Sequence, residues 1–439
     1  MLRREVLRVV PVGAAAALMQ AGTPAAAQPA RPPAGPPPPL PPGAPESIGL
    51  SVPRLAQVTE VLAATVAEGR INGAVLGIAR QGKLGWLRAV GFRDSSQTEP
   101  LRADAIFPLA AMTKPMASVA AMVLVERGRL KLTDPVAAHL PAFREMRVAV
   151  ETRMADSEAV GLSFERARRP ITVQDLLRHT AGMTDGALYP DTPVGRMYAE
   201  AGVQAPDRPL GEAMEALAKL PLVRQPGTMW EDSVATDVLA RVVEVVSGQA
   251  FDRFVAREVT GPLRMADTGF VVAPKDQGRL ALPRIDPLTG ALPAHQDATT
   301  PAVRIGGSTG LMGTASDYLR FGQAMLAGGI LDGVRFLGAG TVAHMTSDHL
   351  GRIPHDSASG QHLLGEGRGF GLGFSVRLGG GVNAMPGSAG DYDWSGADGT
   401  QFVVDPVRDM VAVLMVNQRN QFDHVFRLFR TLVYQTLAR

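Results

Sequence analysis

The sequence predicts an α+β fold: an antiparallel sheet flanked by N- and C-terminal helices, with a mainly helical insertion. The first observation is that strand-like alternation occurs only near the two ends of the folded chain, at 73–91 and from about 370 onward. The second is that the middle, 115–300, is dominated by helical patterns broken by proline and glycine. We detect no internal repeat, so one interrupted domain accounts for this order.

The first 27 residues have the pattern of an export signal. Paired Arg3 and Arg4 precede an apolar run of about a dozen residues, and Ala25–Ala27 form an AxA-like cleavage site. The run is too short for a membrane-spanning helix, which needs about 20 residues. The paired arginines favour the twin-arginine route, and the alternative is an ordinary signal in which two arginines fall together by chance. We therefore expect a periplasmic or secreted protein with no integral membrane span.

The chain after the signal divides into a linker and one domain. Residues 28–47 are rich in proline and predict an extended linker that does not join the packed core. The β-sheet domain is expected to span 48–439. In this interpretation 48–114 and 301–439 form its α/β part, and 115–300 forms its mainly helical part.

Composition excludes several classes of function. Without the three arginines and one glutamate of the signal, the chain keeps 41 basic and 41 acidic residues. A neutral chain without a basic run gives no reason to expect nucleic acid as a partner. There is no cysteine, which excludes disulfides, thiolate nucleophiles and Cys-ligated metal. The histidines lack ligand spacing, so we expect no metal and no cofactor.

The elements before residue 100 have clear local signals. A helix is predicted to begin at Ser51 as its N-cap, with Pro53 in the first turn and apolar residues at helical spacing up to Val66. The stretches 73–80 and 85–91 flank the turn "QGK" and predict a β-hairpin.

Later elements are marked mainly at their ends. Thr172 and Asp175 form a capping-box pattern at the start of a helix, and Gly248 predicts the end of another. From residue 370, three alternating stretches predict antiparallel strands, and 422–437 closes the chain as a helix.

Lys114, in "FPLAAMTKPM" (107–116), has two interpretations. It can be a snorkelling lysine with its ammonium in water, or a buried amine tuned by its neighbours to act as a base. The chain has five lysines against 39 arginines, so an ordinary surface cation at this position would more often be arginine. This bias favours the buried amine.

Several motifs resemble those of β-lactamase-related serine hydrolases: class C β-lactamases, D-alanyl-D-alanine peptidases and especially family VIII carboxylesterases. The resemblance runs from "GLSVPRL" (49–55) to "DMVAVLMVNQ" (409–418). It includes the stretches "AAMTKPM" (110–116), "ITVQDLLRHTAGM" (171–183), "PGTMWEDSVATD" (226–237), "GSTGLMGTASDYLRF" (307–321) and "DYDWSGADGTQFVVDP" (391–406). It implies the fold predicted above, with a small carbonyl compound as ligand.

The resemblance also implies the catalytic positions, and two of them are changed. Members of the family have a serine nucleophile three residues before the lysine, and the lysine helps to deprotonate this serine for attack. Here Ala111 stands at that position, and Asp232 stands where the family has a tyrosine that assists proton transfer. The helix spacing turns the hydroxyl of Thr113 away from the position of Ala111, so Thr113 is expected to be a packing residue.

The third family element, a strand triad at the edge of the site, is present in the esterase style as Trp394, Ser395 and Gly396. The resemblance implies that the N–H of Ala397 joins that of Ala111 in an oxyanion hole, which survives loss of the serine because both donors are backbone groups. Ser233, beside Asp232, is also implied to line the site. Trp394 suggests an apolar or aromatic ligand group, and core packing is the alternative.

Two other candidates compete with these residues. Gly306–Gly310 spells GxSxG, the nucleophile elbow of α/β-hydrolases, with Ser308 as the nucleophile. The required buried strand and following helix are missing from the sequence pattern, so a loop serine is the better interpretation. His179, at a predicted helix end, is either a C-terminal cation or a satisfied core imidazole.

Three functions follow. In the first, Lys114 and Asp232 face each other and, with the backbone oxyanion hole, act directly on an ester, amide or lactone without an acyl-enzyme. In the second, their pairing holds both charged, and the protein is an inactive pseudo-hydrolase that binds a small ligand or a partner. In the third, residual carboxylesterase activity uses another hydroxyl, such as Ser233 or Ser395.

Overall fold

The computed structural model describes residues 40–153, 160–285, 290–292, 298–300, 302–355 and 364–438. The expected export signal and most of the linker lie outside these residues. None of the helices in the described ranges is long and apolar enough to span a membrane.

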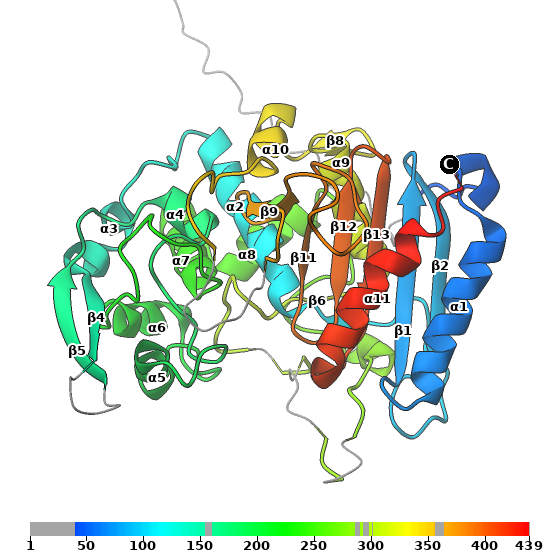
Figure 1. Ribbon diagram of the computed structural model, residues 1–439, viewed down its shortest axis with the longest axis horizontal. Coiled ribbons are helices and arrows are strands. Elements are labelled where there is room, and N and C mark those ends of the chain that lie inside the picture. The colour runs from blue at the N-terminus through cyan, green and yellow to red at the C-terminus, as the bar shows by residue number, and fades with distance from the viewer. Residues whose placement is uncertain are drawn as a thin grey trace, which may run out of the picture. The chain divides into compact units, whose positions relative to one another are not determined.

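A seven-stranded antiparallel sheet in the order β2-β1-β13-β12-β11-β10-β9 organises the structure (Figure 1). Strand β1 pairs with β2 as the predicted hairpin and with β13 on its other side, so the two ends of the chain share one sheet. The predicted α+β fold with an antiparallel sheet is therefore confirmed. The strands of this sheet are β1 (Gly73–Arg80), β2 (Lys83–Gly91), β9 (Arg368–Phe370), β10 (Ser375–Arg377), β11 (Tyr392–Ser395), β12 (Gln401–Asp405) and β13 (Met410–Met415).

Each face of the sheet is covered by helices because apolar side chains alternate along its central strands. Ala74, Leu76 and Ile78 of β1 belong to the core under α1 and α11, which lie over one face (Figure 1). Val75 and the alternate residues of β12 and β13 belong to the larger core on the other face, where α9 packs. We call these the outer and the inner face.

The helices and remaining strands agree with the local signals where those were clear. Helix α1 begins after Ser51, Thr172 and Asp175 form the reciprocal capping box of α4, and Gly248 ends α7 with φ +72°. The helices are α1 (Val52–Ala67), α2 (Thr113–Glu126), α3 (Val136–His139), α4 (Val173–Leu177), α5 (Pro193–Glu200), α6 (Leu210–Leu217), α7 (Ala235–Ser247), α8 (Phe251–Val255), α9 (Ala315–Leu326), α10 (Ala339–Met345) and α11 (Phe422–Tyr434). The short strand pairs are β3 (Phe107–Pro108) with β6 (Met312–Gly313), β4 (Arg147–Arg153) with β5 (Val160–Arg166), and β7 (Ile330–Leu331) with β8 (Val334–Arg335).

Two details differ from the sequence interpretation. The packed chain begins before residue 48, because Leu40 is buried in the main core and Pro42 bridges to Leu84. The end of the proline-rich segment is therefore structural and not linker. The helical part also contains the hairpin β4–β5, which the sequence analysis did not predict.

Candidate functional site

Lys114 and Asp232 form a buried ion pair. Lys114 lies in the first turn of α2, Asp232 lies in the loop before α7, and Lys114 Nζ donates to Asp232 Oδ1. Only 4% of Lys114 and 5% of Asp232 is exposed. Burial alone would raise the pKa of Asp232, but the charge of Lys114 holds it below its usual value. The pair that the sequence led us to expect is thus present.

His179 is a neutral member of the same cluster. Its Nδ1 accepts from the backbone N–H of Ser233 at 3.3 Å, and its Nε2 lies 3.2 Å from Thr236 Oγ1. Burial lowers the pKa of His179 to about 4, although Asp232, with Oδ1 3.5 Å from Nδ1, opposes that shift. Of the two interpretations, the satisfied core imidazole is confirmed and the helix-end cation is wrong.

Two further buried acids lie in the electrostatic surroundings of this pair, and the sequence analysis did not identify them. Asp185 accepts from the N–H groups of Ala187 and Leu188 at 2.8 and 3.0 Å and from Gln204 Nε2 at 2.9 Å. Burial raises the pKa of Asp185 and also that of Glu231. Glu231 directly precedes Asp232 in the sequence, and this position in the same motif could have identified Glu231 as a site residue.

The position of Ala111 is the accessible point of an otherwise buried segment. Between Ala105 and Leu124 it is the one residue that is not fully buried. Ala110 has φ +45°, an uncommon conformation for a residue with a side chain. Such strain persists only where surrounding contacts impose it and often marks functional sites. Here the hydrogen bond from Tyr318 OH to Met112 O, at 2.9 Å, holds the chain two residues after Ala110.

Thr113 does not share this accessible face. It is fully buried, and its Oγ1 accepts from the N–H of Leu311 at 3.3 Å. The expectation that Thr113 is a packing residue is confirmed.

The end of β11 lies against the segment that contains Ala110. Thr400 Oγ1 donates to Leu109 O at 3.2 Å, and a Cβ placed on Gly396 would meet the Cβ of Ala110 at 3.1 Å. A side chain at Gly396 would push these two segments apart. Among the described residues the N–H of Ala397 donates to no carbonyl, and the first N–H groups of a helical turn, such as that of Ala111, lack intrahelical acceptors.

Aromatic rings pack beside the charged cluster. Trp394 lies 5.3 Å from Phe370 and 6.4 Å from Trp230 between ring centroids, and Phe370 lies 5.5 Å from His179. Trp394 belongs to the larger core on the inner face of the sheet, as the packing alternative predicted. The indole N–H groups of Trp394 and Trp230 are buried, and neither finds a hydrogen-bond partner within the described ranges.

The alternative serines are poorly placed for attack. Ser233 is 1% exposed, and its Oγ accepts from the N–H of Ala235 at 3.3 Å. Ser395 is half-buried at the end of β11. Ser308 lies in a loop, and its backbone N–H donates to Asp237. No strand directly precedes Ser308, and the next helix, α9, begins only at Ala315. The nucleophile elbow is therefore absent at Ser308.

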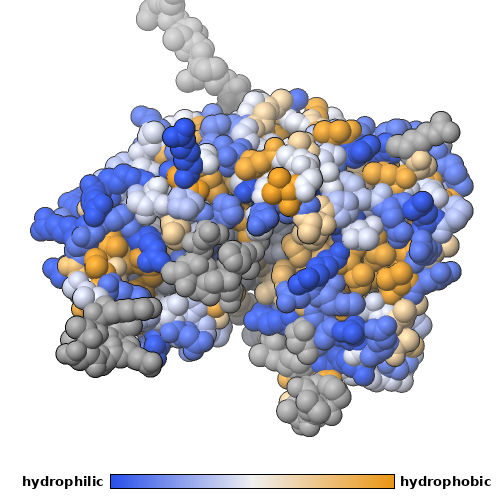
Figure 2. Space-filling view, in the orientation of Figure 1, coloured by the Kyte–Doolittle hydropathy of each residue, from blue (hydrophilic) through white to orange (hydrophobic). Residues whose placement is uncertain are grey.

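The surface shows one hollow near this region and one cavity away from it. The face in Figure 2 is hollowed between the helical part and the strands around β11. A separate surface cavity of about 880 Å³, lined by Arg208, Glu212, Lys219 and Arg241 among others, contains none of the predicted site residues. In the described ranges, no group of three or more His, Asp and Glu side chains is arranged to hold a metal ion.

Comparison with known proteins gives consistent relatives. A family scan matches Beta-lactamase over residues 58–434. Protein Rv1367c of Mycobacterium tuberculosis is 35% identical over 360 residues, covering 79% of this chain and 86% of that protein. Esterase EstB of Burkholderia gladioli is 31% identical over 400 residues, covering 85% and 93%.

Solved structures agree with these sequence relatives. EstCE1, described as a hydrolase with promiscuous acyltransferase activity, superposes with a TM-score of 0.71 at 26% identity and covers 87% of this chain and 99% of its own. Simvastatin synthase (LovD) from Aspergillus terreus has a TM-score of 0.71 at 21% identity, covers 88% and 98%, and supports the fold alone. Because the family match spans most of the sequence and both sequence relatives exceed 30% identity over most of their length, this chain belongs to the Beta-lactamase family.

Proposed function

We propose that this protein binds a small acyl ester or related carbonyl compound in a Beta-lactamase-family site that does not form an acyl-enzyme. The observation that carries the proposal is the buried ion pair between Lys114 and Asp232 beside the accessible methyl group of Ala111. In this proposal Ala111 occupies the place of the family's nucleophile and Asp232 that of its tyrosine.

The chemistry of these groups argues against covalent catalysis. A methyl group has no lone pair with which to attack a carbonyl. Lys114 Nζ already donates to the carboxylate of Asp232 in a buried ion pair, so the amine is not available to accept a proton from a nucleophile. Ser233 and Ser395 are not positioned to replace the missing hydroxyl.

Other parts of the site favour continued binding. The strained backbone at Ala110 and the close approach of Gly396 are retained although the serine is not. We infer that the N–H groups of Ala111 and Ala397 hold the ligand carbonyl oxygen, with Ser233 and the segment Trp394–Gly396 at its border. The names of the relatives, among them an esterase and a lovastatin esterase, suggest acyl esters as the ligand class.

A second candidate is direct turnover without an acyl-enzyme. Asp232 is a weak base because Lys114 lowers its pKa, but the raised pKa of the neighbouring Glu231 suits proton transfer closer to neutral pH. In this version Lys114 and the oxyanion hole stabilise negative charge while Glu231 or Asp232 moves a proton. The N-terminal pattern leads us to propose that either activity takes place after export.

Binding of p-nitrophenyl butyrate tests the proposal. We expect saturable heat in a calorimetric titration, with no release of p-nitrophenolate above the rate in buffer. Ala111→Val fills the accessible position and should weaken binding at least about tenfold. The matched control is Ala63→Val, on the exposed side of α1, which should bind like the native chain.

Each possible failure of this titration has a specific meaning. Absence of saturable binding contradicts the proposal. Release of p-nitrophenolate that is lost in Glu231→Gln or Asp232→Asn would replace binding with direct turnover.

A further inference from the structure

The strands that border the site are short. Strands β9 and β10 are three residues long and β11 is four; β10 pairs with β11 through two residue pairs, and β11 pairs with β12 through four. Ladders this short contribute few hydrogen bonds to the position of a strand. Yet Phe370 on β9 and Trp394 on β11 form the aromatic cluster, and β11 leads into Gly396 and Ala397.

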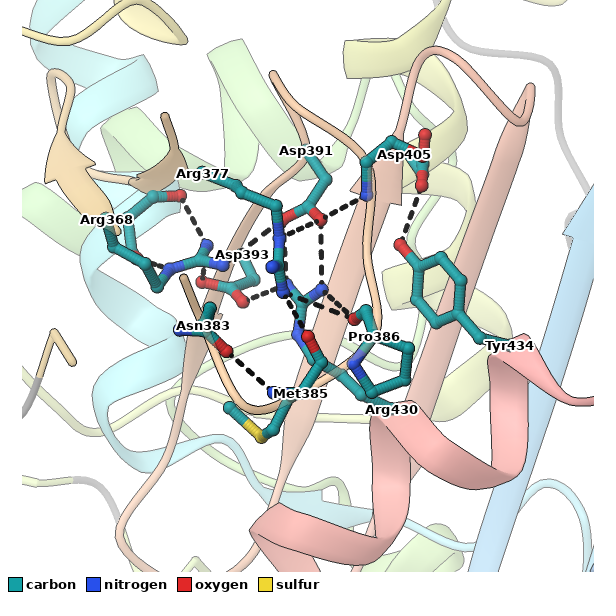
Figure 3. Close-up of polar contacts among 12 residues, drawn as sticks. Arg368, Arg377, Asn383, Met385, Pro386, Asp391, Asp393, Asp405, Arg430 and Tyr434 are labelled. Carbon is teal, nitrogen blue, oxygen red and sulfur yellow. Dashed lines mark hydrogen bonds and ion pairs between the residues drawn. The ribbon is translucent and has the colours of Figure 1, made fainter. Parts of the chain in front are cut away.

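A buried network of arginine and aspartate side chains joins these strands to α11 (Figure 3). Arg430 on α11 donates to both Asp391 and Asp393, with 2.9 Å from Nη2 to Asp391 Oδ1. Arg368 on β9 donates to Asp393 at 2.7 Å, and Arg377 on β10 donates to Asp391 at 2.9 Å. Four separate segments therefore meet at two carboxylates.

The five residues form a closed ionic unit. The three arginines are 2–3% exposed, and Asp391 is fully buried. Burial by itself would raise the pKa of Asp391, but the three guanidiniums hold it below its usual range. The excess positive charge is met by backbone carbonyls, including that of Met385, which accepts from Arg377 at 2.9 Å. Removal of either aspartate therefore raises the excess from one to two buried positive charges.

The network and the candidate site lie on opposite faces of the same strand. Asp393 is paired with Val403, which belongs to the outer core under α1 and α11. Trp394 is paired with Phe402, which belongs to the inner core. Because consecutive side chains leave opposite faces of a strand, fixing Asp393 on one face fixes Trp394 on the other.

We propose that Asp393 and Arg430 are positioning residues for the ligand site, which rests on the function proposed above. They hold β11 from its outer face, so that Trp394, Gly396 and Ala397 keep their places beside Ala110 and Ala111. Neither residue touches the ligand in this proposal.

Fluorine NMR of the full chain labelled with 5-fluorotryptophan tests the positioning directly. The chain has three tryptophans, Trp86, Trp230 and Trp394, and Trp394→Phe identifies the Trp394 resonance. We expect Asp393→Asn to shift or split that resonance and leave Trp86, on β2 at the opposite edge of the sheet, unchanged. The matched control is Tyr434→Phe, which removes a 2.7 Å hydrogen bond from α11 to Asp405 and should leave Trp394 unchanged.

A Trp394 resonance unchanged in Asp393→Asn, or shifted equally in Tyr434→Phe, overturns the proposal. If Asp393→Asn does not fold, Arg430→Lys replaces it as the test variant. This substitution keeps the positive charge but removes the planar fork of N–H donors, and the same shift or splitting of the Trp394 resonance is expected. A second measurement links position to binding: Asp393→Asn should weaken p-nitrophenyl butyrate binding about tenfold or more, and Tyr434→Phe should not. Absence of binding in the native chain contradicts the proposed function, whereas the NMR result still decides the positioning.

Discussion

Replacing Ala111 by serine together with Asp232 by tyrosine is expected to create an esterase. The double variant should hydrolyse p-nitrophenyl butyrate at least about 10³ times faster than the native chain. In the site proposed here, serine would supply a nucleophile three residues before Lys114. Tyrosine removes the carboxylate to which Lys114 Nζ donates, so that the amine is available to the serine hydroxyl.

The single variants separate the two parts of this argument. Ala111→Ser alone should remain close to the native rate because Asp232 still pairs with Lys114. Asp232→Tyr alone should also remain inactive, since it lacks a nucleophile. Full activity in Ala111→Ser would show that the ion pair does not suppress catalysis. An inactive but folded double variant would show that the surrounding pocket does not support acyl transfer.

Breaking the buried ion pair is expected to have the largest effect on stability. Lys114→Met leaves Asp232 as an unpaired buried charge and should lower the free energy of unfolding by about 3–5 kcal/mol. Chemical denaturation measures this loss. The matched control is Lys114→Met combined with Asp232→Leu, which replaces both charges by apolar groups and should recover most of it. Equal losses in the single and double variants would contradict the account.

The pH dependence of this loss has a definite sign. In the native chain the lowered pKa of Asp232 contributes stability above its unfolded pKa, near 3.9, and this is lost as the pH falls through the folded pKa. Without Lys114, burial raises the pKa of Asp232. As the pH falls, protonation of Asp232 removes the unpaired buried charge and the variant regains stability. The difference in the free energy of unfolding between the native chain and Lys114→Met should therefore shrink from pH 7 towards pH 4. Burial raises the pKa of Asp317 to about 7, but Asp317 titrates in both proteins, so its contribution cancels in this difference. A difference that is constant with pH would contradict this reasoning.

Local signals predicted most of the fold because they act within one element. The reciprocal hydrogen bonds of Thr172 and Asp175 and the left-handed Gly248 depend only on nearby backbone. The packing of Leu40 depends on distant residues, and the proline-rich composition is the same on both sides of the true boundary. The hairpin β4–β5 was missed because its alternation is short and lies within a region of helical patterns.

The site shows the same division. The family resemblance brought Lys114 and Asp232 together, although 118 positions separate them along the chain. It did not identify Asp185 or Glu231, whose pKa values depend on burial that no local pattern records. The partners of Arg430 were also missed, because a charged residue in an amphipathic helix normally indicates a solvent-exposed face, and here it is buried against two aspartates.

The most direct test of the central claim is the intact mass of the native protein after incubation with a fluorophosphonate, which labels activated serines covalently. We expect the native chain to keep its unmodified mass, and the Ala111→Ser, Asp232→Tyr double variant to gain one phosphonyl group on Ser at position 111. A phosphonyl group on the native chain, at Ser233, Ser395 or Ser308, would show an activated serine and contradict the proposal that this site works without an acyl-enzyme.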